Sequence, residues 1–282
     1  MRLDICAPVL FFLVTGCPAA KHEGVRVGVE ASLREVGFVP FLAAAYGQAT
    51  GEELEARFLD GPALAEAVER GELDEVLLVS DETVEQLEKE GFLRRREALA
   101  HEELVLIGPR RDHLGKYAES SGAELLRNVA RTNHRFLEGR PGSVEATRLT
   151  RLFRATGDRA RPGSWFSSPH EGRTLVRAAV ASPHAFALVR RSSVLLESRE
   201  GVIPERIWGE GDPALVLVIH AAEVAPAKAG RNLEFHAWLV EEGRKALATW
   251  GEASVGHALF AEGAPATGEG ARFPSIGGTP AP

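Results

Sequence analysis

The sequence has few cysteines, no excess of positive charge and no hydrophobic run long enough to cross a membrane. Only Cys6 and Cys17 occur among its 282 residues. Two cysteines exclude a disulfide framework, a zinc–cysteine cluster and a Cys-x-x-Cys redox site. Lys and Arg number 33 against 40 Asp and Glu. The resulting net charge of −7 argues against a nucleic-acid partner, because phosphates are bound by clustered basic residues.

Motifs for catalysis and metal binding are also absent from the sequence. The nine histidines are scattered, and none belongs to a His-x-x-x-His or Glu-x-x-His pattern. The sequence contains no Gly-x-Ser-x-Gly elbow, phosphate-binding loop or dinucleotide fingerprint. We therefore expect a protein that is not an enzyme, with no metal site and no cofactor.

The sequence contains enough apolar residues for a substantial core. Hydrophobic residues make up 44% of the chain and charged residues 26%, which is too apolar for a disordered protein. A chain of this length forms one large domain or two modest ones.

The N-terminus has the organisation of a secretory signal peptide. Met1-Arg2 is followed by an apolar stretch over residues 5–14 and then by Thr15-Gly16-Cys17. This ending resembles a bacterial lipobox, which implies that residues 1–17 form a lipoprotein signal peptide and that Cys17 is lipidated. Several acyl chains anchor a protein stably to a membrane. An ordinary signal peptide with a chance cysteine, or a buried N-terminal strand, is the alternative.

Short apolar runs alternate with amphipathic stretches from residue 25 onward. The predicted strands are 25–29, 54–59, 76–79, 104–107, 135–137, 185–189 and 215–219. The predicted helices are 32–48, 63–70, 81–90, 122–131, 143–156, 171–181 and 231–250. Ser32 and Glu35 predict a capping box at the start of the first helix. This alternation is typical of an α/β fold with right-handed crossovers.

The strand–helix alternation restarts after residue 109, which favours two α/β lobes over one long sheet. We expect lobe 1 to comprise residues 18–108 and 208–262, and lobe 2 to comprise residues 109–207. Each lobe would be a mainly parallel sheet flanked by helices, with a cleft between the lobes. Residues 263–282 are mostly Gly, Pro, Ala and Thr, and we expect them to be a disordered tail.

Two strand-to-helix turns place a hydroxyl at a helix N-terminus. They are residues 29–33 with Ser32, and residues 138–144 with Ser143. Ligands of open α/β sheets bind at the carboxyl ends of strands, and helix N-termini favour anions. One turn from each lobe could grip an oxyanion across the cleft. Serine at a helix start is, alternatively, only a cap.

The order of several segments resembles the periplasmic tungstate-binding proteins, which are solute receptors of ABC importers. Residues 61–79, which end in Val-Leu-Leu-Val, and Glu90-Gly-Phe with the arginines at 94–96 match family segments. Val105-Leu-Ile-Gly-Pro and Glu210-Gly-Asp-Pro match two others. The resemblance covers residues 25–262 and implies a type II periplasmic-binding-protein-like fold.

The ligand motifs depart from the family pattern. The Thr-Thr-Thr-Ser of the family stands here as Val29-Glu30-Ala31-Ser32, and its arginine and threonine positions in the second lobe carry Glu138 and Val144. Arg140 and a displaced Ser143 could replace them, Arg191 is retained, and Arg190 replaces an acid. The resemblance implies a ligand site formed by Glu30, Ala31, Ser32, Glu138, Arg140, Ser143, Arg190 and Arg191.

The resemblance implies an extracytoplasmic solute-binding lipoprotein of an ABC importer, periplasmic or at the cell surface and held by its lipid anchor. Its partners would be a small-molecule or oxyanion ligand and an ABC permease, and we expect a monomer. Each hydrogen-bond donor lost around a dry dianion leaves about 1–3 kcal/mol uncompensated, and the two added glutamates repel an anion. We therefore expect a different ligand, with a cationic or hydroxyl-rich part. The alternative function is a non-transporting sensor or interaction protein on the same fold.

Overall fold

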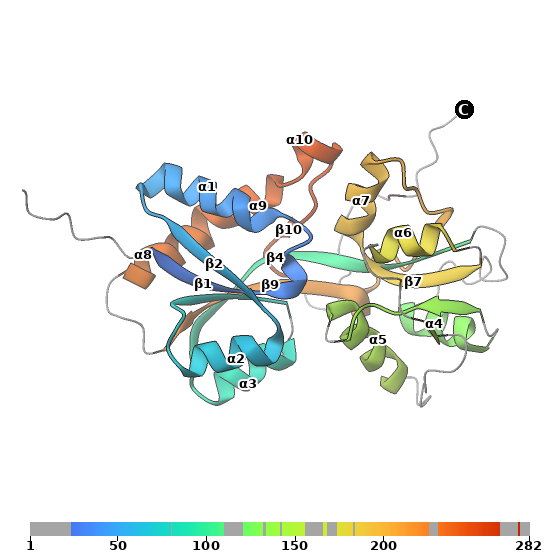
Figure 1. Cartoon of the computed structure of the whole chain (residues 1–282), viewed down its shortest axis with the longest axis horizontal. Helices are drawn as coiled ribbons and strands as arrows, with labels where there is room; N and C mark the ends of the chain where they lie inside the picture. The colour runs from blue at the N-terminus through green and yellow to red at the C-terminus, as the bar shows by residue number, and fades with distance from the viewer. Residues whose placement is uncertain are drawn as a thin grey trace, which may run out of the picture.

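The computed structural model describes residues 24–79, 81–109, 121–131, 134–141, 143–155, 166–167, 174–182, 184–225, 231–265 and 276. The described chain is an α/β protein in two halves, each a sheet with helices on both faces (Figure 1). The predicted signal peptide and Cys17 lie outside the described residues. So does most of the predicted tail, apart from residues 263–265 and 276, and both predictions stay open.

The first half is a sheet in the order β2-β1-β3-β9-β4. Its strands are β1 (Val25–Glu30), β2 (Leu54–Leu59), β3 (Glu75–Leu78), β9 (Val216–Val224), β4 (Leu93–Gly108) and the short edge strand β10 (Ala261–Glu262). β1 runs parallel to β2 and β3, whereas β9 is antiparallel to β3 and β4. The carboxyl ends of β1, β2 and β3 therefore meet at one edge.

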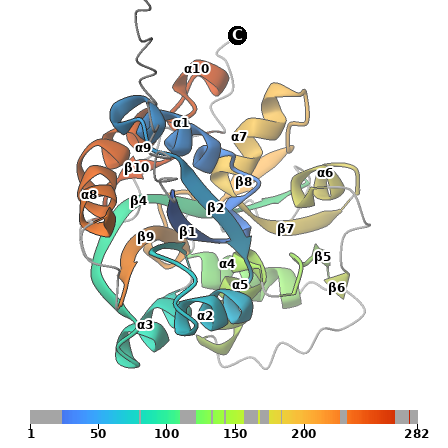
Figure 2. The same ribbon diagram turned by 60° about the vertical axis from the view of Figure 1, so that its left-hand side comes forward.

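Helices cover both faces of this sheet (Figure 2). On one face lie α2 (Gly61–Glu69) and α3 (Asp81–Lys89); on the other lie α1 (Phe38–Thr50), α8 (Arg231–Trp238), η4 (Leu239–Gly243), α9 (Arg244–Thr249) and α10 (Glu252–Val255). Pro62 in the first turn of α2 suits a position whose N–H has no helical partner. Four consecutive buried residues in β3 reflect cover on both faces.

β4 is the strand that joins the two halves. Residues 93–103 of β4 pair with β9 in the first half, and residues 104–107 pair with β7 in the second half. The chain returns through η3 (Pro213–Leu215) directly into β9. The predicted lobe boundaries at 108/109 and 207/208 lie near these two crossings, and we retain them as a proposal.

The second half has the strand order β4-β7-β5-β6, with β8 paired to β4. Its strands are β5 (Arg135–Leu137), β6 (Phe166–Ser167), β7 (Ala185–Arg190) and β8 (Arg206–Trp208). Its helices are α4 (Gly122–Arg131), α5 (Val144–Ala155), α6 (Leu175–Val180) and α7 (Arg191–Arg199), with α4 and α5 on the opposite face from α6 and α7. β5 is parallel to β6 and β7.

The predicted helix over 32–48 is wrong at its start. A short 3-10 turn, η1 (Ala31–Leu33), is followed by Gly37 in the left-handed region at φ 75°, and α1 begins only at Phe38. Glycine adopts this conformation without steric cost, so it separates the two turns. The predicted capping box does not form, because the Ser32 hydroxyl donates to the Glu30 carboxylate instead.

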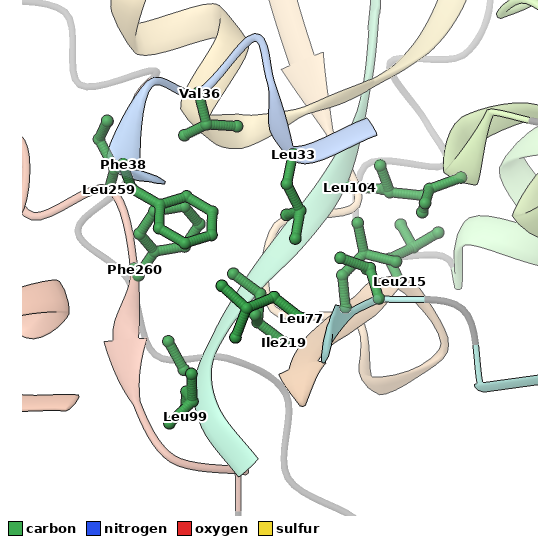
Figure 3. Packing of buried hydrophobic residues seen from close by; sticks show 14 of the residues in the cluster. Leu33, Val36, Phe38, Leu77, Leu99, Leu104, Leu215, Ile219, Leu259 and Phe260 are labelled. Carbon is green, nitrogen blue, oxygen red and sulfur yellow. The ribbon is translucent and has the colours of Figure 1, made fainter. Parts of the chain in front are cut away.

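The main core extends through both halves. Leu33, Phe38 and Leu77 pack with Leu99, Ile219 and Phe260 in the first half (Figure 3). Leu104 on β4 and Leu215 at the return crossing belong to the same cluster, which continues to Phe136 and Phe186 in the second half. The aromatic rings of Phe38 and Phe260 meet edge to face at 5.6 Å. Side chains of β4 and β9 thus pack in a core that is shared by both halves.

Candidate functional site

A cleft of about 430 Å³ lies between the two halves. Its volume falls in the range of small-molecule sites. The first half and the return strand contribute Glu30, Asp60, Gly61, Pro62, Val79, Glu82, Thr83 and Leu217; the second half contributes Pro141, Val144, Thr147, Arg148 and Arg151. The cleft lies at the carboxyl ends of the parallel strands, where open α/β sheets bind ligands.

The helices that begin at the cleft each carry a carboxylate in or before the first turn. Asp60 precedes α2 and accepts the Ala63 N–H at 3.1 Å. Glu82 lies in the first turn of α3, and Glu145 in the first turn of α5. A negative side chain at a helix N-terminus is stabilised by the helix dipole. The positive ends of these helices are thus partly neutralised by the protein itself.

Glu30, at the end of β1, forms part of the floor of the cleft. Its side chain is almost fully enclosed, with 6% of the residue exposed. One carboxylate oxygen accepts the Ser32 hydroxyl at 2.9 Å, and the other accepts the buried Val79 N–H, also at 2.9 Å. The carboxylate is therefore fixed by two donors from neighbouring strand ends.

One face of α5 forms the opposite wall. Val144, Thr147, Arg148 and Arg151 lie at positions i, i+3, i+4 and i+7, a spacing that aligns side chains along one side of a helix. The Arg148 guanidinium donates to the carbonyls of residues 214 and 216, at 3.4 and 3.0 Å. It thereby attaches α5 to the return crossing.

An ion pair spans the cleft between the two halves. Nε of Arg151 on α5 donates to Oε1 of Glu82 on α3 at 2.9 Å. Arg151 is 30% exposed and Glu82 62% exposed, so water weakens the pair, and we expect it to contribute less than about 1 kcal/mol to stability. Its significance is geometric, because it joins residues from opposite walls.

A buried charge cluster lies beside the floor of the cleft. Nη1 of Arg190, at the end of β7, donates to Oε1 of Glu102 on β4 at 2.6 Å, and Ser192 donates to Oε2 at 2.6 Å. Nε of Arg190 lies 3.4 Å from Glu145 on α5. Arg190 is 2% exposed and Glu102 is fully buried. One guanidinium thus links β4, β7 and α5.

Burial and charge act in opposite directions in this cluster. Burial raises the pKa of Glu102, although Arg190 and Ser192 oppose that shift. Burial alone would lower the pKa of Arg190, but the charges of Glu102, Glu145 and Glu30 outweigh it and raise the pKa. Glu30 is therefore within the electrostatic field of Arg190, and three carboxylates share one guanidinium.

A second charge cluster lies on the other face of β4. Glu103 accepts the Gly211 N–H at 2.8 Å, and its carboxylate lies 3.6 Å from Nε of Arg191. Burial raises the pKa of Glu103 to about 7. Burial also lowers the pKa of Arg191, against the charge of Glu103. Glu102 and Glu103, which are adjacent on β4, thus pair with Arg190 and Arg191 on opposite faces of that strand.

The structure brings only part of the sequence-predicted site to the cleft. Glu30 lines it, and Ser32 reaches it through Glu30. Ser143 accepts the Ala146 N–H at 3.2 Å and so caps α5. Arg140 is exposed, whereas Ala31 and Glu138 are half-buried.

Arg190 and Arg191 are buried in the clusters on β4 and do not line the described cleft. Direct ligand contact by Ala31, Ser32, Glu138, Arg140, Ser143, Arg190 or Arg191 stays a prediction.

Most of the cleft wall was not predicted from the sequence. The residues that were not predicted include Asp60, Glu82, Thr147, Arg148 and Arg151. The i, i+3, i+4, i+7 spacing in α5 is present in the sequence, but nothing local shows which face of a helix meets the other half. The 69-residue separation between Arg151 and Glu82 likewise leaves no local signal.

Two structural findings bear on the class of the site. Among the residues that the structure describes, no group of three or more His, Cys, Asp or Glu side chains could hold a metal ion. Within the same part of the chain, none of the helices has both the length and the hydrophobicity of a membrane span. The lining of the described cleft has carboxylates on one wall and guanidiniums on the other. This arrangement is suited to holding a polar solute.

Similar solved structures share this architecture. A tungstate-binding protein from Desulfovibrio alaskensis G20 superposes with a TM-score of 0.71 at 21% identity, over 86% of this chain and 99% of that one. A tungstate ABC transporter structure from Geobacter sulfurreducens gives a TM-score of 0.64 at 17% identity, over 81% of this chain and 99% of that one. A periplasmic molybdate-binding protein from Azotobacter vinelandii gives 0.51 at 16% identity, over 82% and 97%. At these identities the likeness shows the fold.

A comparison with curated proteins gave no match. The family model for bacterial extracellular solute-binding proteins matches residues 25–227, which is more than half of the chain and includes both walls of the cleft. The protein therefore belongs to the bacterial extracellular solute-binding proteins.

Proposed function

We propose that this protein is the solute receptor of an ABC importer and that it binds a small polar solute in the cleft between its halves. The observation that carries the proposal is the cleft itself, whose walls come from both halves. β4 and the return through η3 into β9 are two strand crossings that connect the described halves. A rotation about these two crossings would open and close the cleft, as in hinge closure around a ligand.

The Arg151–Glu82 ion pair would form as the cleft closes. Its two residues belong to opposite walls, 2.9 Å apart at the ion pair, so opening must break it. Because the pair is partly exposed, it would bias the closed state only slightly. Solute binding would supply the remaining free energy of closure. The closed state would therefore be favoured only while the solute is bound.

The family and the signal-peptide pattern support a location outside the cytoplasm, in the periplasm or at the cell surface. On this proposal Cys17 carries the lipid anchor, the receptor acts as a monomer, and its protein partner is an ABC permease. The protein binds and delivers its solute without chemical change. The similar solved structures named for tungstate and molybdate make oxyanions the first solutes to test.

The proposal is tested by blocking the cleft. Purified protein is screened by thermal unfolding against oxyanions, amino acids, amines and sugars, and hits are measured by calorimetry. At 100 times its Kd a solute adds about 2.7 kcal/mol of stability, or roughly 5–10 °C in Tm for a chain of this size. Thr147→Trp fills the cleft wall; Thr150→Trp, on the exposed side of the same helix, is the matched control.

We expect a solute that stabilises the wild type and Thr150→Trp but not Thr147→Trp. Binding that Thr147→Trp leaves unchanged would contradict the proposed site. Uptake of the same radiolabelled solute by cells that produce either variant tests transport. Uptake that is equal in both strains would contradict an importer receptor and favour the sensor alternative.

A further inference from the structure

Two hydrogen-bond donors at the floor of the cleft converge on one position. The Ser32 hydroxyl and the Val79 N–H come from the turns after β1 and β3, and both donate to the Glu30 carboxylate at 2.9 Å. We call these two groups the donor pair. Converging hydroxyl and backbone N–H donors at strand ends are a suitable arrangement for an oxyanion. Here the position is occupied by a carboxylate of the chain itself.

The surrounding charge opposes a second anion. Glu102, Glu145 and Glu30 all lie in the field of the buried guanidinium of Arg190. Charges buried in a low dielectric must be balanced locally, because leaving one uncompensated is costly. Arg191, the other buried arginine here, is opposed by Glu103 and Glu210 as well as by Glu102. Carboxylates therefore outnumber guanidiniums, and no surplus positive charge is left for a dianion.

The described first-half wall of the cleft is also negative. Its charged lining residues are Glu30, Asp60 and Glu82, and none of its described lining residues is basic. The basic lining residues, Arg148 and Arg151, lie on α5 in the other half. A solute that contacts the floor therefore meets carboxylates first. These carboxylates repel an anion and attract a cation.

We propose that the Glu30 carboxylate is a built-in occupant of the donor pair, which makes the cleft reject tetrahedral dianions and select a small solute that places an ammonium group against Glu30. This inference rests on the proposed solute-receptor function and names the solute class of that same cleft. An organic cation fits better than a metal ion, because no cluster of metal-ligating side chains occurs among the described residues.

The test measures binding to wild type, Glu30→Gln and Glu30→Ser by calorimetry. The anionic probes are sodium tungstate and sodium molybdate, and the ammonium probes are the amino acids and short diamines. Glu30→Gln removes the charge and keeps the size, whereas Glu30→Ser also vacates the donor pair. Glu55→Ser is the matched control, because Glu55 is exposed on the neighbouring strand β2. Circular dichroism confirms that each variant is folded.

We expect wild type and Glu55→Ser to bind tungstate with a Kd weaker than about 1 mM. Glu30→Ser should bind it at least about tenfold more tightly, since it frees two donors and removes one repelling charge. At least one ammonium probe should bind the wild type and weaken at least about tenfold in Glu30→Gln.

Three results would overturn the inference: sub-micromolar tungstate binding by the wild type, unchanged tungstate binding in both Glu30 variants, or a wild type that binds no ammonium probe. These results are separate from failure of the proposed function. The function fails if Thr147→Trp leaves solute binding intact, whatever the charge of the solute. If tungstate binds the wild type tightly and Thr147→Trp blocks this binding, the role of Glu30 is contradicted but the solute-receptor function is supported.

Discussion

Replacing Arg190 by methionine should strongly destabilise the protein. Arg190 is 2% exposed, and its guanidinium neutralises the fully buried Glu102 carboxylate at 2.6 Å. It also lies 3.4 Å from Glu145. Methionine fills similar space but leaves these carboxylates without their counter-charge, and β4, on which Glu102 lies, joins both halves.

The expected loss follows from the cost of an uncompensated buried charge. Removing one partner of a buried ion pair costs about 3–5 kcal/mol of unfolding free energy, against a total of about 5–15 kcal/mol for a typical domain. For a chain of this size 1 kcal/mol corresponds to roughly 2–4 °C. We therefore expect Tm to fall by roughly 6–20 °C at pH 7.

The loss should also depend on pH. Burial raises the pKa of Glu102 above its ordinary value of 4.5, and removal of Arg190 raises it further. A carboxyl whose pKa is higher in the folded state favours folding below the unfolded pKa and loses that contribution as pH rises. The difference in Tm between wild type and Arg190→Met should therefore be small near pH 4.5 and widen toward pH 8.

A double variant distinguishes the buried charge from simple loss of packing. Arg190→Met combined with Glu102→Gln removes both partners, and such replacement of a buried pair is often nearly neutral. The double variant should recover most of the lost stability, and Arg199→Met, at an exposed position, should change Tm by less than about 2 °C. An Arg190→Met variant as stable as wild type at pH 8, or no recovery in the double variant, would show that the buried charge of Glu102 is not what destabilises the protein.

Three other predictions concern the rest of the structure. Glu82→Gln, which breaks the exposed ion pair to Arg151, should change the unfolding free energy by less than about 1 kcal/mol while weakening solute binding measurably at low salt by calorimetry. Burial raises the pKa of Glu75 to about 7, and its hydrogen bond and charge raise the pKa of His236 despite burial. Both groups thus stabilise the fold at low pH and lose that contribution as pH rises from about 5 to 8, and Glu75→Gln should flatten this part of a Tm-against-pH profile. Gly108→Ala, whose added methyl would overlap the Phe186 ring, should cost about 1–3 kcal/mol in urea unfolding.

Local sequence patterns predicted most of the strands and helices. They did not predict the strand boundaries that depend on partners far along the chain. The apolar runs that became β1, β2, β3 and β7 were predicted within about one residue of their ends. β4 was predicted only over 104–107, although it spans Leu93–Gly108. Its first part contains Glu102 and Glu103, whose buried carboxylates are tolerated because partners far along the chain reach them.

Of the predicted ligand-site residues, only Glu30 lines the described cleft. The residues on the opposite wall were not predicted. Glu30 was identified through the resemblance to the tungstate-binding proteins, within a strand-to-helix turn that the local pattern predicted. Ser32 and Ser143 have local roles, one as a donor to Glu30 and the other as the cap of α5. The opposite wall, with Arg148 and Arg151, depends on how the two halves meet, which no short segment encodes.

A solute that binds between the halves should close them. Spin labels at Glu85→Cys on α3 and Arg154→Cys on α5, both exposed and on opposite sides of the cleft, report the separation of the halves by pulsed electron resonance, with Cys6 and Cys17 replaced. We predict that a saturating solute from the binding screen narrows the distance distribution and shifts it to shorter values. A distribution that the solute leaves unchanged would contradict closure of the halves around the solute.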